Sequence, residues 1–312
     1  MTFHKRFDII LFMLKTGIVG IGKLGSIHLR IYKEIKEIKE IYLVDTNKSA
    51  LEPLSEYPHF RDYRKLKGKV DLVSIATPTF SHFEIAQFFL ENKIPVLVEK
   101  PITQRLGEAE KLIQTAKKNR TLLLVGHVER YNNAYLAIKE IVKNPLFIEC
   151  HRLNPYPNRS LDISVVLDLM IHDLDIILDL VRDKIKKVEA KGVKVLSPAE
   201  DIANARLTFK KGCVANITSS RISVKKERKI RIFLTNCYIS LDYAQQQAEI
   251  YQKVDKEIKS RFLPINKEEP LKKEIVDFVN LVKEGEFQIQ EATKAKDALA
   301  LALKIQKTIE KG

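Results

Sequence analysis

The sequence predicts an α/β protein: an N-terminal domain with a parallel sheet flanked by helices, then an α+β domain with a large, open and mainly antiparallel sheet. Two patterns predict this fold class. In the first half of the chain, short β-rich segments alternate with helical ones, which is typical of a parallel sheet flanked by helices. From about residue 127, long alternating runs dominate and helices become few, which favours an antiparallel sheet. We therefore predict domains at 1–126 and 127–312.

The first domain begins with a nearly unbroken apolar run, KTGIVGI, as a strand buried on both faces requires. The segment SIHLRIYKEI that follows has the apolar spacing of an amphipathic helix. The same alternation continues along the domain. Strands are expected over residues 15–21, 41–47, 70–78, 94–101 and 121–130. Helices are expected over residues 26–35, 79–93 and 109–120.

The second domain opens with two helical segments, at 139–143 and 164–181. Extended runs follow over residues 184–196, 201–222 and 229–243. A hairpin turn is expected at Lys211-Gly212. The lysine-rich segment 253–270 predicts an edge strand and a loop. The chain ends in an amphipathic helix at about 291–311.

The formal net charge of +14 raises the question of a nucleic-acid partner. The lysines are scattered among glutamates, as in YKEIKEIKE, and form no basic block with interleaved aromatic residues. We therefore expect a solvated lysine-rich surface and no nucleic-acid partner. An intermediate alternative is an anionic small substrate held by a few of these cations.

The three cysteines, Cys150, Cys213 and Cys237, lie far apart, with no CxxC and no neighbouring pair of histidines. Neither a disulfide framework nor a zinc site is indicated, and a reducing cytoplasm fits best. Residues 1–13 are expected to be an N-terminal extension, with Met13 as an alternative start. The apolar stretch 9–14 is too short to span a membrane, so no membrane partner is expected.

Three glycines follow the first strand at the spacing Gly20-x-Gly22-x-x-Gly25. In a strand-to-helix turn, the first glycine permits the tight turn, the second lets a pyrophosphate approach and the third lets helix and strand pack closely. Asp45 ends the next strand, where a carboxylate accepts hydrogen bonds from the adenosine ribose and repels a 2′-phosphate. The pattern predicts an NAD site, with NADP disfavoured. The alternative is a tight turn with no ligand.

Lys100 follows Glu99 at the carboxyl end of a predicted parallel strand, where open α/β sheets place their ligands. A lysine there can stabilise a developing alkoxide, and Pro101 fixes the backbone beside it. The alternative is a solvated lysine after an edge strand.

The apolar helix VVLDLMIHDLDIILDL carries Asp168 and His172 four residues apart, and Asp175 and Asp179 continue the helical spacing. A histidine beside a carboxylate is a suitable general base, and Asp168 could orient the imidazole, hold a substrate hydroxyl, or both. A structural His-Asp pair on the wet side of the helix is the alternative. A metal site would need more ligands than the sequence places nearby, so no metal is expected.

The segment ATPTFSH ends a predicted strand at Thr77-Pro78 and begins a helix at His82. Such a loop lies beside the nicotinamide half of a dinucleotide. A plain proline turn with a capping side chain is the alternative.

These motifs together, GIVGIGKLG, VD, ATPTFSH, VEKP and an Asp-x-x-x-His helix, resemble the glucose-fructose oxidoreductase / inositol dehydrogenase / MocA family over nearly the whole chain. The resemblance implies a Rossmann domain, an α+β domain whose open sheet often forms a homodimer or homotetramer interface, and a last helix packed on the first domain. It implies that Lys100, Asp168 and His172 are catalytic, with His172 accepting a proton. It implies cofactor contacts from Gly20, Gly22, Lys23, Leu24, Gly25, Asp45, Thr77, Pro78, His82 and Glu99.

One departure is the segment DLMIH, which lacks the glycine that many sugar dehydrogenases of the family have between the Asp and the His. The stretches GHVERYNNAY, VVLDLMIHDLDII and SSRISVKKERKIRIF resemble instead the branch that acts on nucleotide sugars, including UDP-N-acetylglucosamine 3-dehydrogenases. In that branch Arg130, Arg152 and Arg221 would meet a pyrophosphate, and salt bridges are the alternative for each. The expected reaction transfers hydride from a sugar carbon, C3 of a UDP-N-acetylhexosamine, to NAD. The alternatives are a free-sugar or polyol dehydrogenase and a non-catalytic NAD-redox sensor.

Overall fold

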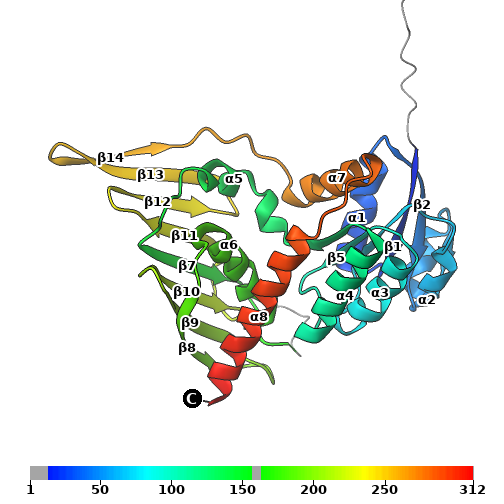
Figure 1. Cartoon of the computed structure of the whole chain (residues 1–312), viewed down its shortest axis with the longest axis horizontal. Coiled ribbons are helices and arrows are strands. Elements are labelled where there is room, and N and C mark those ends of the chain that lie inside the picture. Colours follow the sequence, from blue (N-terminus) through cyan, green and yellow to red (C-terminus); the bar gives the residue numbers. More distant parts are fainter. Residues whose placement is uncertain (1–12, 157–162, 312) are drawn as a thin grey trace, which may run out of the picture. The chain divides into compact units, whose positions relative to one another are not determined.

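The computed structural model describes residues 13–156 and 163–311, which form two compact units (Figure 1). The first unit comprises residues up to Glu99 with Lys111–Leu124 and Ile275–Ile289. The second comprises Lys100–Glu110, Val125–Glu274 and the chain from Gln290. The predicted extension falls mostly on residues 1–12, outside the described residues. The predicted boundary at 126/127 stays a prediction.

The first unit is built on a six-stranded sheet in the order β3-β2-β1-β4-β5-β6. Its strands are β1 (Leu14–Val19), β2 (Ile38–Val44), β3 (His59–Phe60), β4 (Leu72–Ile75), β5 (Val96–Glu99) and β6 (Leu123–Gly126). Its helices are α1 (Lys23–Glu34), α2 (Lys48–Leu51) and α3 (His82–Glu91). Helices α4 (Leu106–Asn119) and α7 (Pro270–Lys283) belong to this unit from Lys111 and from Ile275 onward. The parallel Rossmann sheet that the sequence predicts is confirmed.

The register of this sheet brings three strand ends level. Val19 of β1 pairs with Val44 of β2 and with Ile75 of β4, all in parallel. The next residues along each strand, Gly20 and Asp45 among them, therefore lie at one edge of the sheet. This is the carboxyl edge at which open α/β sheets bind their ligands.

The second unit is built on an eight-stranded sheet in the order β14-β13-β12-β11-β7-β10-β9-β8, antiparallel except for the pair β7–β10. Its strands are β7 (Phe147–Leu153), β8 (Ile185–Val193), β9 (Ile202–Phe209), β10 (Val214–Ser220), β11 (Glu227–Phe233), β12 (Cys237–Asp242), β13 (Gln247–Val254) and β14 (Glu257–Phe262). Its helices are α5 (Asn133–Lys139), α6 (Ile171–Val181) and α8 (Gln290–Lys311), with a π-helical turn over Val166–Met170. The predicted antiparallel sheet, the edge strand and the turn at Gly212 are confirmed.

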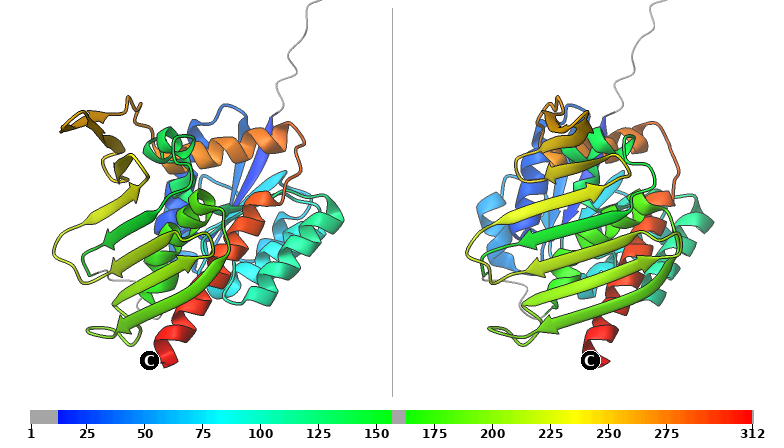
Figure 2. Two further views of the ribbon diagram at one scale, coloured as in Figure 1. Left: turned by 60° about the vertical axis from the view of Figure 1, so that its left-hand side comes forward. Right: turned by 90° about the vertical axis from the view of Figure 1, so that its left-hand side faces the viewer.

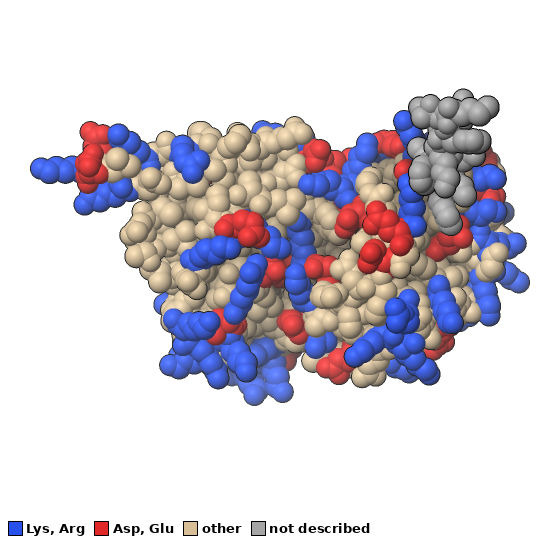
Figure 3. Space-filling model, turned by 45° about the horizontal axis from the view of Figure 1, so that its top comes forward, with Lys and Arg blue, Asp and Glu red and all other residues tan. Residues whose placement is uncertain are grey.

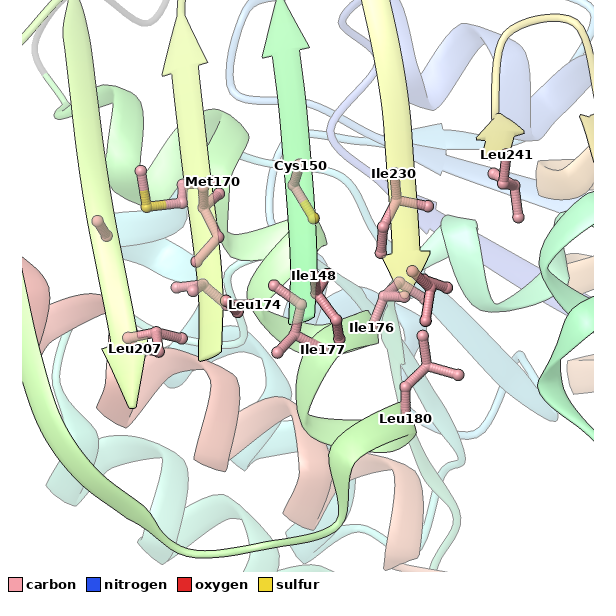
Figure 4. Packing of buried hydrophobic residues seen from close by; sticks show 14 of the residues in the cluster. Ile148, Cys150, Met170, Leu174, Ile176, Ile177, Leu180, Leu207, Ile230 and Leu241 are labelled. Atoms are coloured by element: carbon pink, nitrogen blue, oxygen red, sulfur yellow. The ribbon is translucent and has the colours of Figure 1, made fainter. Parts of the chain in front are cut away.

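Helices α6 and α8 cover one face of this sheet, as the second view in Figure 2 shows. Buried side chains of α6, such as Leu174 and Ile177, pack against Ile148, Leu207 and Ile230 of the strands (Figure 4). The alternation of buried and exposed residues along β7 and β9 is what a sheet with a single covered face requires. Helix α8 contacts α6 and β8 within this unit. Its predicted packing on the first domain concerns the placement of the two units and stays a prediction.

Several elements differ from the sequence prediction. The sequence did not indicate strands β3, β7 and β13 or helix α7. The helix predicted over 139–143 is wrong, since α5 ends at Lys139 and a turn follows. A run as short as KEIVK fits either a helix or the turn that follows one. Here the preceding segment NAYLAIK forms the helix.

Basic and acidic side chains are interleaved on the face that Figure 3 shows. The mixing of the two charges on this face agrees with the predicted solvated, lysine-rich surface. No described helix is long and apolar enough to cross a membrane.

The core packing generates a stability prediction. Ile177→Ala removes a fully buried side chain from α6 and is expected to lower the free energy of unfolding by about 2–5 kcal/mol. The matched control, Ile258→Ala, changes a residue that is 75% exposed on β14 and is expected to change stability by less than about 1 kcal/mol. Chemical denaturation monitored by circular dichroism would measure both. Equal losses in the two variants would contradict this description of the core.

Candidate active site

The glycine turn after β1 has the geometry that the motif predicts. Gly20 has a φ of +93°, and a Cβ there would lie 2.8 Å from the carbonyl oxygen of Ala76. A Cβ on Gly25 would lie 1.8 Å from the carbonyl oxygen of Gly20, so only glycine lets α1 begin so close to the turn. A Cβ on Gly22 would meet nothing within 4 Å, so the space beside this residue is open. The turn is a cradle with room on its outer side.

Helix α1 begins at Lys23 directly after this turn, with Leu24 and Gly25 in its first turn. No side chain caps its N-terminus, and its first turn holds no acidic residue. Such an end presents backbone N–H groups and positive potential to an anion. Asp45 is fixed beside the turn, because its Oδ2 accepts from the Ile21 N–H at 2.7 Å and its Oδ1 from the Asn47 N–H at 2.8 Å. These residues fit the diphosphate and ribose of a dinucleotide.

The ATPTFSH loop adjoins the same cradle. A Cβ on Gly20 would also come within 2.9 Å of Thr77 Cγ2, so Thr77 lies against the first glycine. His82 is buried, and its Nε2 lies 2.9 Å from the Thr77 carbonyl oxygen. The structure thus brings Thr77 to the cradle, and His82 contacts the Thr77 carbonyl group. Cofactor contacts of Pro78 and His82 stay predictions.

Glu99, at the end of β5, is buried, and its Oε1 lies 3.2 Å from Nε2 of His28 on α1. The sequence analysis did not select His28. Its place in the amphipathic pattern of α1 predicts only that it is buried. The contact ties the end of β5 to α1 within the first unit, and a cofactor contact of Glu99 stays a prediction.

Lys100 begins the second unit, next to a cis peptide bond with Pro101. Its Nζ donates to the Asp168 backbone carbonyl at 2.6 Å and to Asp168 Oδ1 at 3.1 Å. The side chains of Lys100 and Asp168 are 16% and 21% exposed, so the pair is sheltered but open to a ligand. The alternative of a freely solvated lysine is therefore wrong.

The pairing of Asp168 with Lys100 changes the role that the helical spacing predicts for Asp168. Asp168 lies inside the π-helical turn Val166–Met170, whereas His172 lies in α6 beyond it. A π turn takes up an extra residue, so the spacing of four no longer places two side chains together as it does in an α-helix. Asp168 holds the Lys100 ammonium, and among the described residues it makes neither a hydrogen bond nor an ion pair with His172.

His172 is half-buried, with its Nδ1 enclosed and without a hydrogen-bond partner among the residues that the structure describes. Burial, the Lys100 ammonium and further nearby cations hold the pKa of His172 well below its ordinary value. The ring is therefore neutral at pH 7 and able to accept a proton. Its neighbour is His127, whose ring lies edge-on at a centroid distance of 6.4 Å.

Arg152 of β7 is the centre of a buried ionic cluster. Its Nε and Nη2 donate to the two oxygens of Asp173 at 2.9 Å each, and its Nη1 donates to Glu129 Oε1 at 2.9 Å. Burial alone would lower the pKa of Arg152, but Asp173 and Glu129 raise it above its ordinary value. The geometry favours the salt-bridge alternative for Arg152, since all three donor groups already have carboxylate partners.

The other two predicted arginines also have protein partners. Arg130 donates to both oxygens of Asp175, at 2.5 and 2.6 Å, and to Glu291. Arg221 is buried, donates to the carbonyl oxygens of Ile163 and Glu200, and lies 3.5 Å from Asp201. The geometry favours a structural role for both, and their proposed contact with a pyrophosphate gains no support.

Sequence reasoning missed several residues around His172 and Arg152. They are His127, Glu129, Arg228, which is the register partner of Arg152, and Tyr243, whose ring centroid lies 5.5 Å from Cζ of Arg152. His127 and Glu129 stand in GHVERYNNAY, a segment from which only Arg130 was selected. Arg228 lies in the long basic run SVKKERKIR, where nothing in the sequence distinguishes it from surface cations. Within residues 13–156 and 163–311, no group of His, Cys, Asp or Glu has the arrangement of a metal site.

The cradle generates a prediction about Gly25. Gly25→Ala would force α1 away from the Gly20 carbonyl and is expected to weaken NADH binding by roughly tenfold or more, which corresponds to at least about 1.4 kcal/mol. Gly107→Ala is the matched control, because a Cβ there meets nothing within 4 Å. Fluorescence titration with NADH measures both variants. Unchanged NADH affinity in Gly25→Ala would rule out the cradle as the diphosphate site.

Comparison with known proteins agrees with this geometry. Residues 14–127 match the model of the Gfo/Idh/MocA oxidoreductase family with an NAD-binding Rossmann fold, and residues 144–240 match a C-terminal domain of the same family. UDP-N-acetylglucosamine 3-dehydrogenase of Acidithiobacillus ferrooxidans is 31% identical, covering 95% of this chain and 97% of that protein. Its solved structure superposes with a TM-score of 0.88, at 32% identity over 96% of this chain and 98% of that one.

More distant relatives include myo-inositol 2-dehydrogenase of Thermotoga maritima, 25% identical over 95% of this chain and 96% of that protein. A scyllo-inositol dehydrogenase of Lactobacillus casei, solved with NAD(H) and scyllo-inositol, shares the fold at 20% identity, with a TM-score of 0.80 over 96% of this chain and 97% of that one. The two matched models together cover more than half of the chain, and the first relative covers 95% of it. The protein therefore belongs to the Gfo/Idh/MocA family of NAD-binding oxidoreductases.

Proposed function

We propose that this protein is a dehydrogenase that oxidises a secondary hydroxyl of a nucleotide sugar, at C3 of a UDP-N-acetylhexosamine. The observation that carries the chemistry is a neutral, partly enclosed His172 in the same unit as the Lys100–Asp168 pair. The likeness to UDP-N-acetylglucosamine 3-dehydrogenase supports the substrate class. The departure in DLMIH from the pattern of the free-sugar enzymes points the same way.

In the proposed mechanism His172 accepts the proton of the substrate hydroxyl, because its depressed pKa keeps the imidazole neutral. The Lys100 ammonium stabilises the negative charge that develops on the oxygen. Asp168 keeps that ammonium in place through both its carboxylate and its backbone carbonyl. A bound nicotinamide supplies the hydride acceptor.

We propose that the cradle Gly20, Gly22, Lys23, Leu24 and Gly25 holds the cofactor, with Thr77 and Pro78 beside it. NAD is preferred over NADP, because the fixed carboxylate of Asp45 would repel a 2′-phosphate. Both oxygens of Asp45 already accept one backbone N–H each, and each retains a lone pair for a ribose hydroxyl.

We also propose that the protein works in the cytoplasm as a homodimer or homotetramer through the second-domain sheet. The three cysteines are free, which agrees with a reducing compartment. The sheet face away from α6 carries half-buried aromatic rings in contact across neighbouring strands. Phe233, Tyr238 and Tyr251 stack in succession, and Phe147 lies against Phe233 at a tilt. An apolar ladder of this kind on an uncovered face is typical of an interface.

The second candidate is a dehydrogenase of a free polyol, favoured by the likeness to myo-inositol 2-dehydrogenase. A non-catalytic NAD-redox sensor is disfavoured, because a sensor has no use for a neutral histidine beside a held lysine.

Substrate class is tested by the absorbance of reduced nicotinamide after mixing protein and NAD with UDP-N-acetylglucosamine, its uronic acid, free glucose or myo-inositol. We expect reduction with the UDP sugars alone, and inhibition by free UDP. Turnover of free myo-inositol that UDP does not inhibit would support the second candidate, a polyol dehydrogenase.

The role of His172 is tested by substitution. His172→Ala is expected to lower kcat by roughly hundredfold or more, since it removes the general base. NADH affinity should be unchanged, because the proposed diphosphate and ribose contacts come from the glycine turn and Asp45 and not from His172. His151→Ala, a change at a partly exposed histidine of β7, is the matched control and should retain wild-type turnover. Near-normal turnover by His172→Ala would exclude it as the base.

The pH dependence follows from the direction of the pKa shift. Because burial and Lys100 lower the pKa of His172, the acid limb of kcat/KM is expected below the ordinary histidine value of 6.5. Lys100→Met removes one of the cations that depress this pKa, so its residual activity should show an acid limb at higher pH. An acid limb that moves to lower pH in Lys100→Met would contradict the electrostatic account.

A further inference from the structure

Arg228 lies directly opposite Arg152 in the sheet. The two residues are partners in the antiparallel register of β11 and β7. Along β11, Arg228 alternates with Ile230 and Ile232, which are buried against the helix-covered face, so its side chain projects to that same face. Two like charges directly across a strand pair destabilise a sheet. The position therefore requires compensation.

The nearby carboxylates do not neutralise the charge of Arg228 through direct contact. Both oxygens of Asp173 accept from Arg152. Glu129 Oε1 accepts from Arg152, and Glu129 Oε2 accepts from the Asn132 side chain. In the part of the chain that the structure describes, the side chain of Arg228 makes neither a hydrogen bond nor an ion pair. It differs in this from Arg130, Arg152 and Arg221.

The guanidinium of Arg228 is half-buried. Its Nε is enclosed without a partner, whereas its two terminal nitrogens are not among the enclosed atoms and remain accessible. Burial lowers the pKa of Arg228, and Arg152 lowers it further. A half-buried cation without an anionic partner is unfavourable, and an oxyanion bound to the terminal nitrogens would compensate the charge of this guanidinium.

The guanidinium also belongs to the surroundings of the proposed base. The charge of Arg228 acts on His172, as do those of Lys100, Arg152 and His127. A ligand group held by Arg228 would therefore lie within electrostatic reach of the same imidazole.

We propose that Arg228 is a substrate-binding residue that holds an oxyanion of the substrate through its accessible guanidinium nitrogens. This inference rests on the proposed function, under which the oxyanion is the diphosphate of the nucleotide sugar. A guanidinium presents paired donors that match phosphate and carboxylate oxygens in bidentate geometry. Arg228 thus takes the place that the sequence assigned to three arginines which the structure pairs with protein groups.

The first test is calorimetric titration of UDP and of uridine into wild-type protein, Arg228→Met and Arg228→Lys. Arg228→Met is expected to weaken UDP binding by roughly tenfold to a hundredfold and to leave uridine binding unchanged. Arg228→Lys keeps the positive charge but lacks the planar guanidinium. Its UDP affinity should lie between those of the wild type and Arg228→Met. Arg231→Met, three residues along β11 on the opposite face, is the matched control and should bind UDP as the wild type does.

A folding readout accompanies the titration. Because Arg228 is an unpaired, half-buried cation opposite Arg152, Arg228→Met should retain or raise the Tm of the ligand-free protein. The rise in Tm that UDP causes in the wild type should disappear. In turnover with UDP-N-acetylglucosamine, KM should increase far more than kcat falls, as expected for loss of uniform binding.

The outcomes separate this inference from the proposed function. Wild-type turnover of UDP sugars together with equal UDP affinity in Arg228→Met overturns the role of Arg228 and leaves the proposed function standing. If the wild type turns over no UDP sugar, the proposed function fails, and free glucuronate becomes the probe. Glucuronate binding that depends on Arg228 supports an oxyanion site for a carboxylate, and its absence overturns the inference.

Discussion

The contact on which the active site depends is the one between the Lys100 ammonium and Asp168. Lys100 directly follows the last residue of β5, and its Nζ is held by the carboxylate and the backbone carbonyl of a residue in the π-helical turn. The cation is thereby fixed in a sheltered place without losing access to a ligand. Its charge also depresses the pKa of His172. In the proposed mechanism, the same ammonium would therefore keep the imidazole neutral and stabilise the negative charge that develops on the substrate oxygen.

The acidic residues of α6 serve different partners. Asp173 binds Arg152, Asp175 binds Arg130, and Asp179 accepts from Tyr135 and contacts Lys139. Each carboxylate is matched with a cation or hydroxyl group, as buried charges require. His172 shares the helix with these paired residues, but its Nδ1 has no partner among the described residues. The acidic side chains of the helix therefore hold it against β7 through Asp173 and against the segment 128–139 through Asp175 and Asp179.

The sequence predicts those residues of the site whose positions depend only on their neighbours along the chain. Gly20, Gly25 and Asp45 follow from the needs of a strand-to-helix turn, and Lys100 from its place at a strand end. The arginine partners could not be predicted, because Arg130 meets Asp175 and Glu291 through contacts 45 and 161 residues apart. The π turn also escaped prediction, since the apolar pattern fits an uninterrupted α-helix, and Asp168 was therefore assigned to His172. Arg228 is an ordinary basic residue in sequence, and only its pairing register with Arg152 distinguishes it.

The central claim is that the held lysine and the neutral histidine serve hydride removal from C3 of a nucleotide sugar. The most direct measurement uses UDP-N-acetylglucosamine carrying deuterium at C3 alone, with the reduced cofactor analysed by mass spectrometry. The account predicts that the cofactor gains the deuterium. Reduced cofactor without deuterium would show that the hydride leaves another carbon and would contradict the account.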